Sequence, residues 1–185
     1  MHEYRVTDRE TVHRGFTYDL VVETVEMPGG GTALREYTDH SGAVLTVPLD
    51  EHGRVAMIRQ YRVPAKEYLW ELPAGIRDIE GEDPAQTARR ELAEEVDLRC
   101  ERLEKLGEFY TTPGISSELI HYYLATGLSP VPDSERHERT EEEADIELAW
   151  WDLDKALAAV ASGQIRNGVC ALALNLVRLH LGSGK

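Results

Sequence analysis

Three glutamates within five residues, preceded by a helix start and a glycine loop, constrain this chain more than any other feature. Glu91, Glu94 and Glu95 follow Asp83 and Pro84, a good helix cap and a residue that suits the first helical position. At 3.6 residues per turn, Glu91 and Glu95 share one face. The pattern predicts a helix that begins near Pro84, keeps an acidic edge available and docks through an adjoining apolar stripe of Ala85, Ala88, Leu92 and Val96.

The acidic edge needs positive charge beside it, because like charges four residues apart destabilise a helix. Hard divalent cations such as Mg²⁺ or Mn²⁺ prefer carboxylate and carbonyl oxygens, and they usually share their coordination shell with substrate phosphates. The alternative is a solvated acidic face with Arg89 and Arg90 as local partners. Gly75 and Glu82, upstream of the helix, favour the metal site.

Residues 75–98 resemble the signature of the Nudix hydrolases, G-x5-E-x7-R-E-U-x-E-E-x-G-U, in which U is aliphatic. The loop from Gly75 to Glu82 is one residue longer than the signature, and Asp97 stands where the family usually has glycine. A loop absorbs one residue at little cost, and aspartate tolerates the left-handed conformation that this glycine usually adopts. The matched positions are Gly75, Glu82, Arg90, Glu91, Leu92, Glu94, Glu95 and Leu98.

The resemblance implies an α+β Nudix fold, in which a mixed β-sheet is sandwiched between helices. It also implies the metal ligands. Glu91 and Glu95 would be the principal ligands, the Ala74 carbonyl another, and Glu94 an additional or bridging one.

Two further roles are implied for residues near the metal site. Glu82 and Arg90 would form an ion pair that braces the loop against the helix and orients the ligands. The alternative for Arg90 is a solvent-exposed partner of Glu94. The general base is expected outside the signature, on a loop corresponding to residues 139–145. Glu143 is the first choice and Glu142 the second, with a solvated acidic loop as the alternative.

Segments along nearly the whole chain are similar to ADP-ribose pyrophosphatases, a Nudix subfamily. Pro113 lies fifteen residues after Leu98, where that subfamily has a proline as a substrate marker; by itself it could be a simple turn. The resemblance implies metal-dependent hydrolysis of the pyrophosphate bond of ADP-ribose to AMP and ribose 5-phosphate. The similar segments are residues 9–16, 27–31, 59–62, 70–75, 112–114 and 142–145.

Substrate contacts are expected from side chains outside the signature. Arg62 could clamp phosphate, because a guanidinium matches phosphate oxygens bidentately. Arg35 aligns with an adenine-contacting arginine of relatives, and Phe16 or Tyr18 could stack on the base, although aromatic residues on strands are more often core or interface residues. Glu118 could contact the terminal ribose.

Composition limits the class of protein and its partners. A length of 185 residues suits one domain with a small N-terminal extension. The net charge of −14 argues against binding to nucleic-acid backbones or anionic membranes, and no apolar run approaches a membrane span. Cys100 and Cys170 have no metal-ligand spacing and are expected as free buried thiols. We therefore expect a cytoplasmic protein, and the resemblance implies an enzyme of nucleotide metabolism.

Strand-like runs fill most of the chain, and helices dominate its end. Residues 1–42 are expected as an N-terminal β-unit ahead of a Nudix domain at 43–185. Subfamily members are dimers that exchange such units, so the resemblance implies a homodimer. The expected strands are 16–26, 33–38, 43–49, 54–62, 67–72, 103–111, 118–126 and 146–151, and the expected late helices are 153–161 and 168–181.

Two other functions stay open. One is a Nudix pyrophosphatase that acts on another nucleoside diphosphate derivative, such as an NDP-sugar, NADH or FAD. The other is a Nudix-fold ligand sensor without turnover, which is disfavoured because every carboxylate of the signature is kept and no winged-helix extension is evident.

Overall fold

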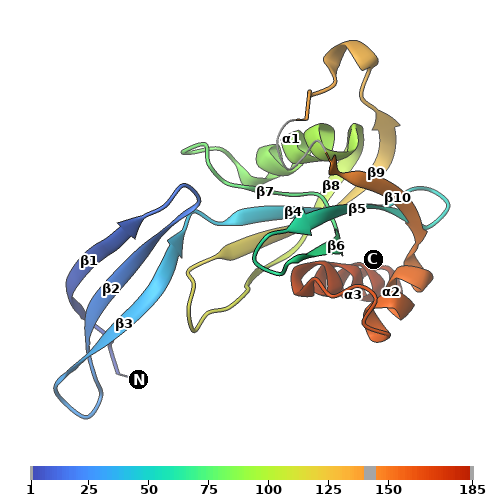
Figure 1. Cartoon of the computed structure of the whole chain (residues 1–185). Helices are drawn as coiled ribbons and strands as arrows, with labels where there is room; N and C mark the ends of the chain where they lie inside the picture. The colour runs from blue at the N-terminus through green and yellow to red at the C-terminus, as the bar shows by residue number, and fades with distance from the viewer. Residues whose placement is uncertain (1, 140–144, 184–185) are drawn as a thin grey trace. The chain divides into compact units, whose positions relative to one another are not determined.

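The computed structural model describes residues 2–139 and 145–183, which fold into three sheets and three α-helices (Figure 1). They divide into two compact units. The first holds the residues up to Gly42 together with Phe109–Ile120, and the second holds Ala43–Glu108 with the residues from His121 onward. The two candidate bases, Glu142 and Glu143, lie outside the described residues.

The first unit contains an antiparallel sheet of β1 (Val6–Arg14), β2 (Tyr18–Glu26) and β3 (Thr32–His40). Its β2–β3 turn uses Gly30 and Gly31 at φ values of 80° and 76°, which glycine adopts without steric cost. The loop after Tyr110 joins this sheet: the amide of Thr38 donates to the Ile115 carbonyl over 2.9 Å. The amide of Ser117 donates to the Thr38 carbonyl over 3.0 Å.

The sequence pattern predicted no strand at β1. All but one of its residues are exposed, so it lacks the alternation of apolar and polar residues that marks a half-buried strand. Its pairing with β2 holds it in the sheet.

The second unit is built on two sheets. One has the strand order β7 (Ala74–Ile76), β4 (Ala43–Pro48), β9 (Leu119–Pro130) and β8 (Leu98–Tyr110). The other is antiparallel, in the order β10 (Glu147–Asp152), β5 (Arg54–Arg62) and β6 (Glu67–Glu71). β8 begins five residues earlier than the expected strand at 103, directly after the preceding helix.

Helices α1 (Pro84–Val96), α2 (Leu153–Ala161) and α3 (Gly168–Gly182) complete the second unit. In Figure 1, α1 lies on one side of β4, and α2 and α3 lie on the other. Every residue of β4 is buried, because Val44 packs with Ala88 of α1 while α3 contacts the same strand. The two C-terminal helices coincide with the expected ranges to within one residue. Across the described residues, no helix is both long and apolar enough to cross a membrane.

Candidate active site

Helix α1 begins where the sequence predicted. The side chain of Asp83 accepts a hydrogen bond from the Ala85 amide over 2.8 Å, and Pro84 occupies the first turn, where its missing N–H costs nothing. At the other end, Asp97 adopts the left-handed conformation at φ 55°, and its N–H donates to the Leu92 carbonyl. Aspartate therefore fills the position of the family's glycine without leaving that backbone conformation.

Two of the three carboxylates on the acidic edge of α1 are buried, although the edge was expected to stay available. Glu91 and Glu95 are buried at 9% and 6% exposure, on the face that also holds Leu92 and Val96. Only the Glu94 side chain, at 31% exposure, keeps substantial access to solvent. The expectation of an open acidic edge was wrong because strand β7 lies against it.

Two residues of β7, Ala74 and Gly75, contact the two buried carboxylates. The amide of Ala74 donates to Glu95 Oε2 over 2.8 Å. A Cβ added to Gly75 would lie 2.0 Å from Glu91 Cδ, so only glycine allows this approach. A glycine at position 75 is therefore needed for Glu91 to pack in this position.

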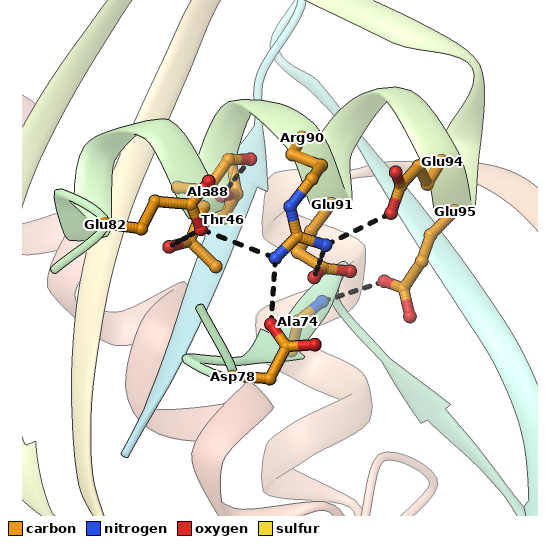
Figure 2. A network of polar contacts seen from close by, with 10 residues as sticks. Thr46, Ala74, Asp78, Glu82, Ala88, Arg90, Glu91, Glu94 and Glu95 are labelled. Atoms are coloured by element: carbon orange, nitrogen blue, oxygen red, sulfur yellow. Dashed lines mark hydrogen bonds and ion pairs between the residues drawn. The ribbon is translucent and has the colours of Figure 1, made fainter. Parts of the chain in front are cut away.

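Arg90 lies between four carboxylates (Figure 2). Its Nη1 is 2.8 Å from Glu91 Oε1 and 3.3 Å from Glu94 Oε2. Its Nη2 is 3.3 Å from Asp78 Oδ1 and 3.5 Å from Glu82 Oε2. Burial lowers the pKa of Arg90, but the neighbouring carboxylates outweigh burial and raise the pKa above its ordinary value. Both predicted partners, Glu82 and Glu94, thus contact one guanidinium.

The donor types suit a hard divalent cation, because the Glu95 carboxylate lies against the backbone of Ala74, and Glu91 and Glu94 share the Arg90 guanidinium nearby on α1. Among the described residues, however, no three side chains of Asp, Glu, His or Cys are gathered as a finished metal site. The Arg90 guanidinium supplies positive charge to Glu91 and Glu94 in this arrangement. A cation held by these two carboxylates would therefore share them with Arg90.

Arg62 is paired with a buried carboxylate that sequence reasoning missed. Its Nη2 and Nε lie 2.6 Å and 3.1 Å from Oε2 of Glu71, which is 3% exposed, and Nε also lies 3.0 Å from Oε1. Gln60 donates to the same carboxylate over 3.2 Å. Glu71 lies three residues before Ala74, so this pair stands close to the metal candidates along the chain. The polar residues Gln60 and Glu71 in otherwise apolar strands were the available signal.

The first unit contains a hollow of about 420 Å³. Arg35 lines it, and its Nη1 donates to the Leu34 carbonyl over 2.8 Å. Pro113, the expected substrate marker, also lines it. Tyr37, Tyr110, Ser116 and Ser117 add aromatic surface and hydroxyl groups. Arg35 and Pro113, which were selected from the sequence for different reasons, thus line the same cavity.

The other expected substrate residues also lie in the first unit. Phe16 is fully exposed at the β1–β2 turn, and Tyr18 is half exposed, so neither belongs to a core of this chain. Glu118 accepts a hydrogen bond from the Thr111 hydroxyl over 2.6 Å, and its Oε1 lies 3.9 Å from His40 Nε2. Glu118 therefore has structural partners.

Comparison with known proteins identifies the family. A NUDIX domain model matches residues 39–169. The chain is 42% identical to an ADP-ribose pyrophosphatase of Mycobacterium tuberculosis over 91% of this chain and 80% of that protein. It is 35% identical to an ADP-ribose pyrophosphatase of Bacillus subtilis, over 96% and 94%. It is also 35% identical to a methanol dehydrogenase activator of Bacillus methanolicus, over 97% and 95%.

A solved structure described as an ADP compounds hydrolase matches the fold. The TM-score is 0.84 at 23% sequence identity, and the match covers 100% of this chain and 97% of that one. The α+β Nudix architecture expected from the sequence is thereby confirmed. With the signature residues assembled on α1 and relatives that match along nearly their whole length, the chain belongs to the Nudix hydrolase family and is an enzyme of that family.

Proposed function

We propose that the chain hydrolyses the pyrophosphate bond of ADP-ribose to AMP and ribose 5-phosphate in a reaction that depends on a divalent cation. The observation that carries this proposal is the group of α1 carboxylates packed against Ala74 and Gly75. Identities of 42% and 35% to two ADP-ribose pyrophosphatases support the substrate.

The cation is proposed to be Mg²⁺, held by Glu91, Glu95, Glu94 and the Ala74 carbonyl. When bound, it supplies charge neutralisation for the pyrophosphate and lowers the pKa of a coordinated water. Arg90 keeps the ligands oriented through its contacts with Glu91 and Glu94.

Two further side chains complete the proposed chemistry. The Arg62 side chain is 41% exposed and is held in place by Glu71, and its guanidinium is proposed to bind a phosphate oxygen. Glu143, or Glu142 if the register differs by one residue, takes the proton of the attacking water.

The adenosine half is proposed to bind the hollow beside Arg35 and Pro113. Phe16 is fully exposed, so its ring could stack on the adenine that is bound by a second chain. We therefore propose a homodimer whose chains exchange their N-terminal β-units. We also propose that the enzyme works in the cytoplasm.

A panel of nucleoside diphosphate derivatives, assayed with Mg²⁺ in ¹⁸O-labelled water, tests the substrate. ADP-ribose should give the highest kcat/KM, with AMP and ribose 5-phosphate as products and the label on one of them. Faster turnover of an NDP-sugar, NADH or FAD would replace the proposed substrate while keeping the reaction. No turnover of any of them would favour a ligand sensor.

The adenosine site has its own test. Arg35→Met should raise KM for ADP-ribose about tenfold, with kcat changed about twofold or less. Arg5→Met is the matched control and should change neither; it removes an exposed ion pair between the residue before β1 and Glu26 of β2. Light scattering at micromolar concentration should give the mass of two chains, and a monomer would reject the exchanged dimer.

A further inference from the structure

The four carboxylates around Arg90 divide into two pairs, one on each terminal nitrogen. Nη1 contacts Glu91 and Glu94, which are proposed metal ligands on α1. Nη2 contacts Asp78 and Glu82, which lie in the loop between β7 and α1. Figure 2 shows the guanidinium between the two pairs. One side of Arg90 therefore faces the proposed metal site, and the other side faces carboxylates that have been given no ligand role.

A divalent cation bound to Glu91 and Glu94 competes with the Nη1 side of Arg90. Two positive centres that bind the same carboxylates repel each other, so the Nη1 contacts of 2.8 Å and 3.3 Å oppose binding of the cation. The Nη2 contacts involve neither ligand and can persist when the cation is bound. The strength of the Nη2 contacts therefore affects how readily Arg90 gives up the other two.

Arg90 is held in this arrangement through its terminal nitrogens. Its Nε is buried and has no hydrogen-bond partner within the described part of the chain. A buried donor without a partner is unfavourable, so the guanidinium does not use all its donors here. A pivot about the Nη2 contacts would break the two Nη1 contacts and no hydrogen bond at Nε.

The two carboxylates at Nη2 differ in their surroundings. Glu82 Oε2 also accepts a hydrogen bond from the hydroxyl of the buried Thr87 over 2.7 Å, and the Glu82 side chain is only 15% exposed. The Asp78 side chain is 68% exposed and contacts Arg90 from the loop. A substitution at Glu82 would also disturb the first turns of α1, whereas a substitution at Asp78 tests the contact with Arg90.

We propose that Asp78 is a positioning residue, which retains Arg90 when a divalent cation takes over Glu91 and Glu94. The Asp78 carboxylate offsets the contacts that the guanidinium gives up, so it favours cation binding without touching the cation. The inference rests on the proposed function, because it needs Glu91 and Glu94 as metal ligands.

Mn²⁺ titration calorimetry on the full chain, without substrate, tests the role of Asp78. Asp78→Asn should raise the Kd for Mn²⁺ about threefold, the size expected for loss of one partly exposed ion pair. The kcat at saturating Mn²⁺ should stay within about twofold of wild type. Glu80→Gln removes a carboxylate from the same exposed loop and is the matched control, with an unchanged Kd.

The Arg90→Met background separates retention of Arg90 from other effects of the Asp78 charge. If Asp78 acts through Arg90, adding Asp78→Asn to Arg90→Met should change the Mn²⁺ Kd by less than about 1.5-fold. A threefold rise in this background too would overturn the inference, because Asp78 would then act on the cation without Arg90. Circular dichroism checks the fold, and Arg90→Gln serves the same purpose if Arg90→Met does not fold.

A crystal structure of the chain with bound Mn²⁺ gives a second readout. We expect Nη2 of Arg90 to remain within about 3.5 Å of Asp78, while Nη1 lies more than about 4 Å from Glu91. An Arg90 that keeps its contact with Glu91 beside bound Mn²⁺ would overturn the inference.

The outcomes separate this inference from the function on which it rests. A wild-type Kd in folded Asp78→Asn would overturn the inference alone. A wild-type chain that binds no Mn²⁺, or a Glu91→Gln variant that binds it as tightly as wild type, would overturn the proposed metal site and the inference with it. A substrate other than ADP-ribose would leave the inference standing, because the calorimetry contains no substrate.

Discussion

The Glu91 carboxyl group lies against the Cα of Gly75, where any other residue would carry a side chain. A Cβ on residue 75 would lie 2.0 Å from the Glu91 carboxyl carbon. The approach is enforced from the neighbouring residue, because the Ala74 amide binds Glu95. Strand β7 and helix α1 therefore fix each other's position, and a change at Gly75 displaces a carboxylate of α1.

Gly75→Ala should displace Glu91 and weaken metal activation. We expect the half-saturating Mg²⁺ concentration to rise about tenfold and the stability to fall by about 1–3 kcal/mol, as for other overpacked sites. Steady-state kinetics against Mg²⁺ concentration and thermal melts measure both effects. Gly168→Ala, where an added Cβ meets nothing within 4 Å, is the control. Unchanged Mg²⁺ activation in Gly75→Ala would contradict the role given to Glu91.

Glu91→Gln and Glu95→Gln should each lower kcat by orders of magnitude, because each removes a ligand charge and keeps the side-chain shape. In Glu95→Gln the Ala74 amide can still donate to the oxygen of the new side-chain amide, so the fold should be retained. Mn²⁺ titration calorimetry should show weaker binding in both variants. Glu80→Gln, at an exposed loop position, is the control. If either variant kept more than about a tenth of wild-type kcat, a loss below ~1.4 kcal/mol, that residue would not be a ligand.

Glu143→Gln should lower kcat strongly and leave Mg²⁺ and ADP-ribose affinity within about threefold, because a base moves a proton and holds no metal. Glu142→Gln should have a much smaller effect. Raising the pH should partly restore the Glu143→Gln variant, since more of the attacking water is then ionised without a base. Kinetics of both variants across pH decide the assignment: equal mild losses would remove the base from this segment, and a large loss only at position 142 would move it by one residue.

His121 should make the fold less stable in mild acid. Burial lowers the pKa of His121, and Lys105 and Arg77 lower it further against the opposing charges of Glu108 and Asp83. The folded state thus binds the proton less tightly than the unfolded chain. Stability from neutral His121 is present above the ordinary pKa of about 6.5 and is lost as the pH falls below that value.

Thermal melts at about pH 7.5 and about pH 5.5 measure this effect. The fall in Tm between the two should be smaller in His121→Gln than in the wild-type chain. His52→Asn alters an exposed histidine and should leave the wild-type fall unchanged. An equal fall in wild type and His121→Gln would assign the acid sensitivity to other groups.

Local chemistry made the helices predictable. The Asp83-Pro84 cap sets the start of α1, and the left-handed Asp97 sets its end. The burial of Glu91 and Glu95 was not predictable in the same way, because it depends on strand β7, whose position against α1 is decided by tertiary packing. The same limit applies to Arg139, which meets Asp97 across 42 residues of chain. Glu71 was missed because its partner Arg62 lies on the neighbouring strand.

Strand β1 marks a different limit. Sequence periodicity detects a buried face, and an exposed strand held by backbone pairing and by surface contacts such as Arg9 with Glu23 has none.

The pairing of β3 with the loop at Ile115 to Ser117 has a consequence for synthesis on the ribosome. The contact between His40 and Ser117 spans 77 residues, so the N-terminal sheet emerges long before the segment that completes it. Until then the Thr38 N–H and C=O groups remain without their loop partners. Because an unpaired strand edge can pair with another chain, this interval favours association between nascent chains, and pulse-labelled hydrogen exchange at the Thr38 amide would time when it closes.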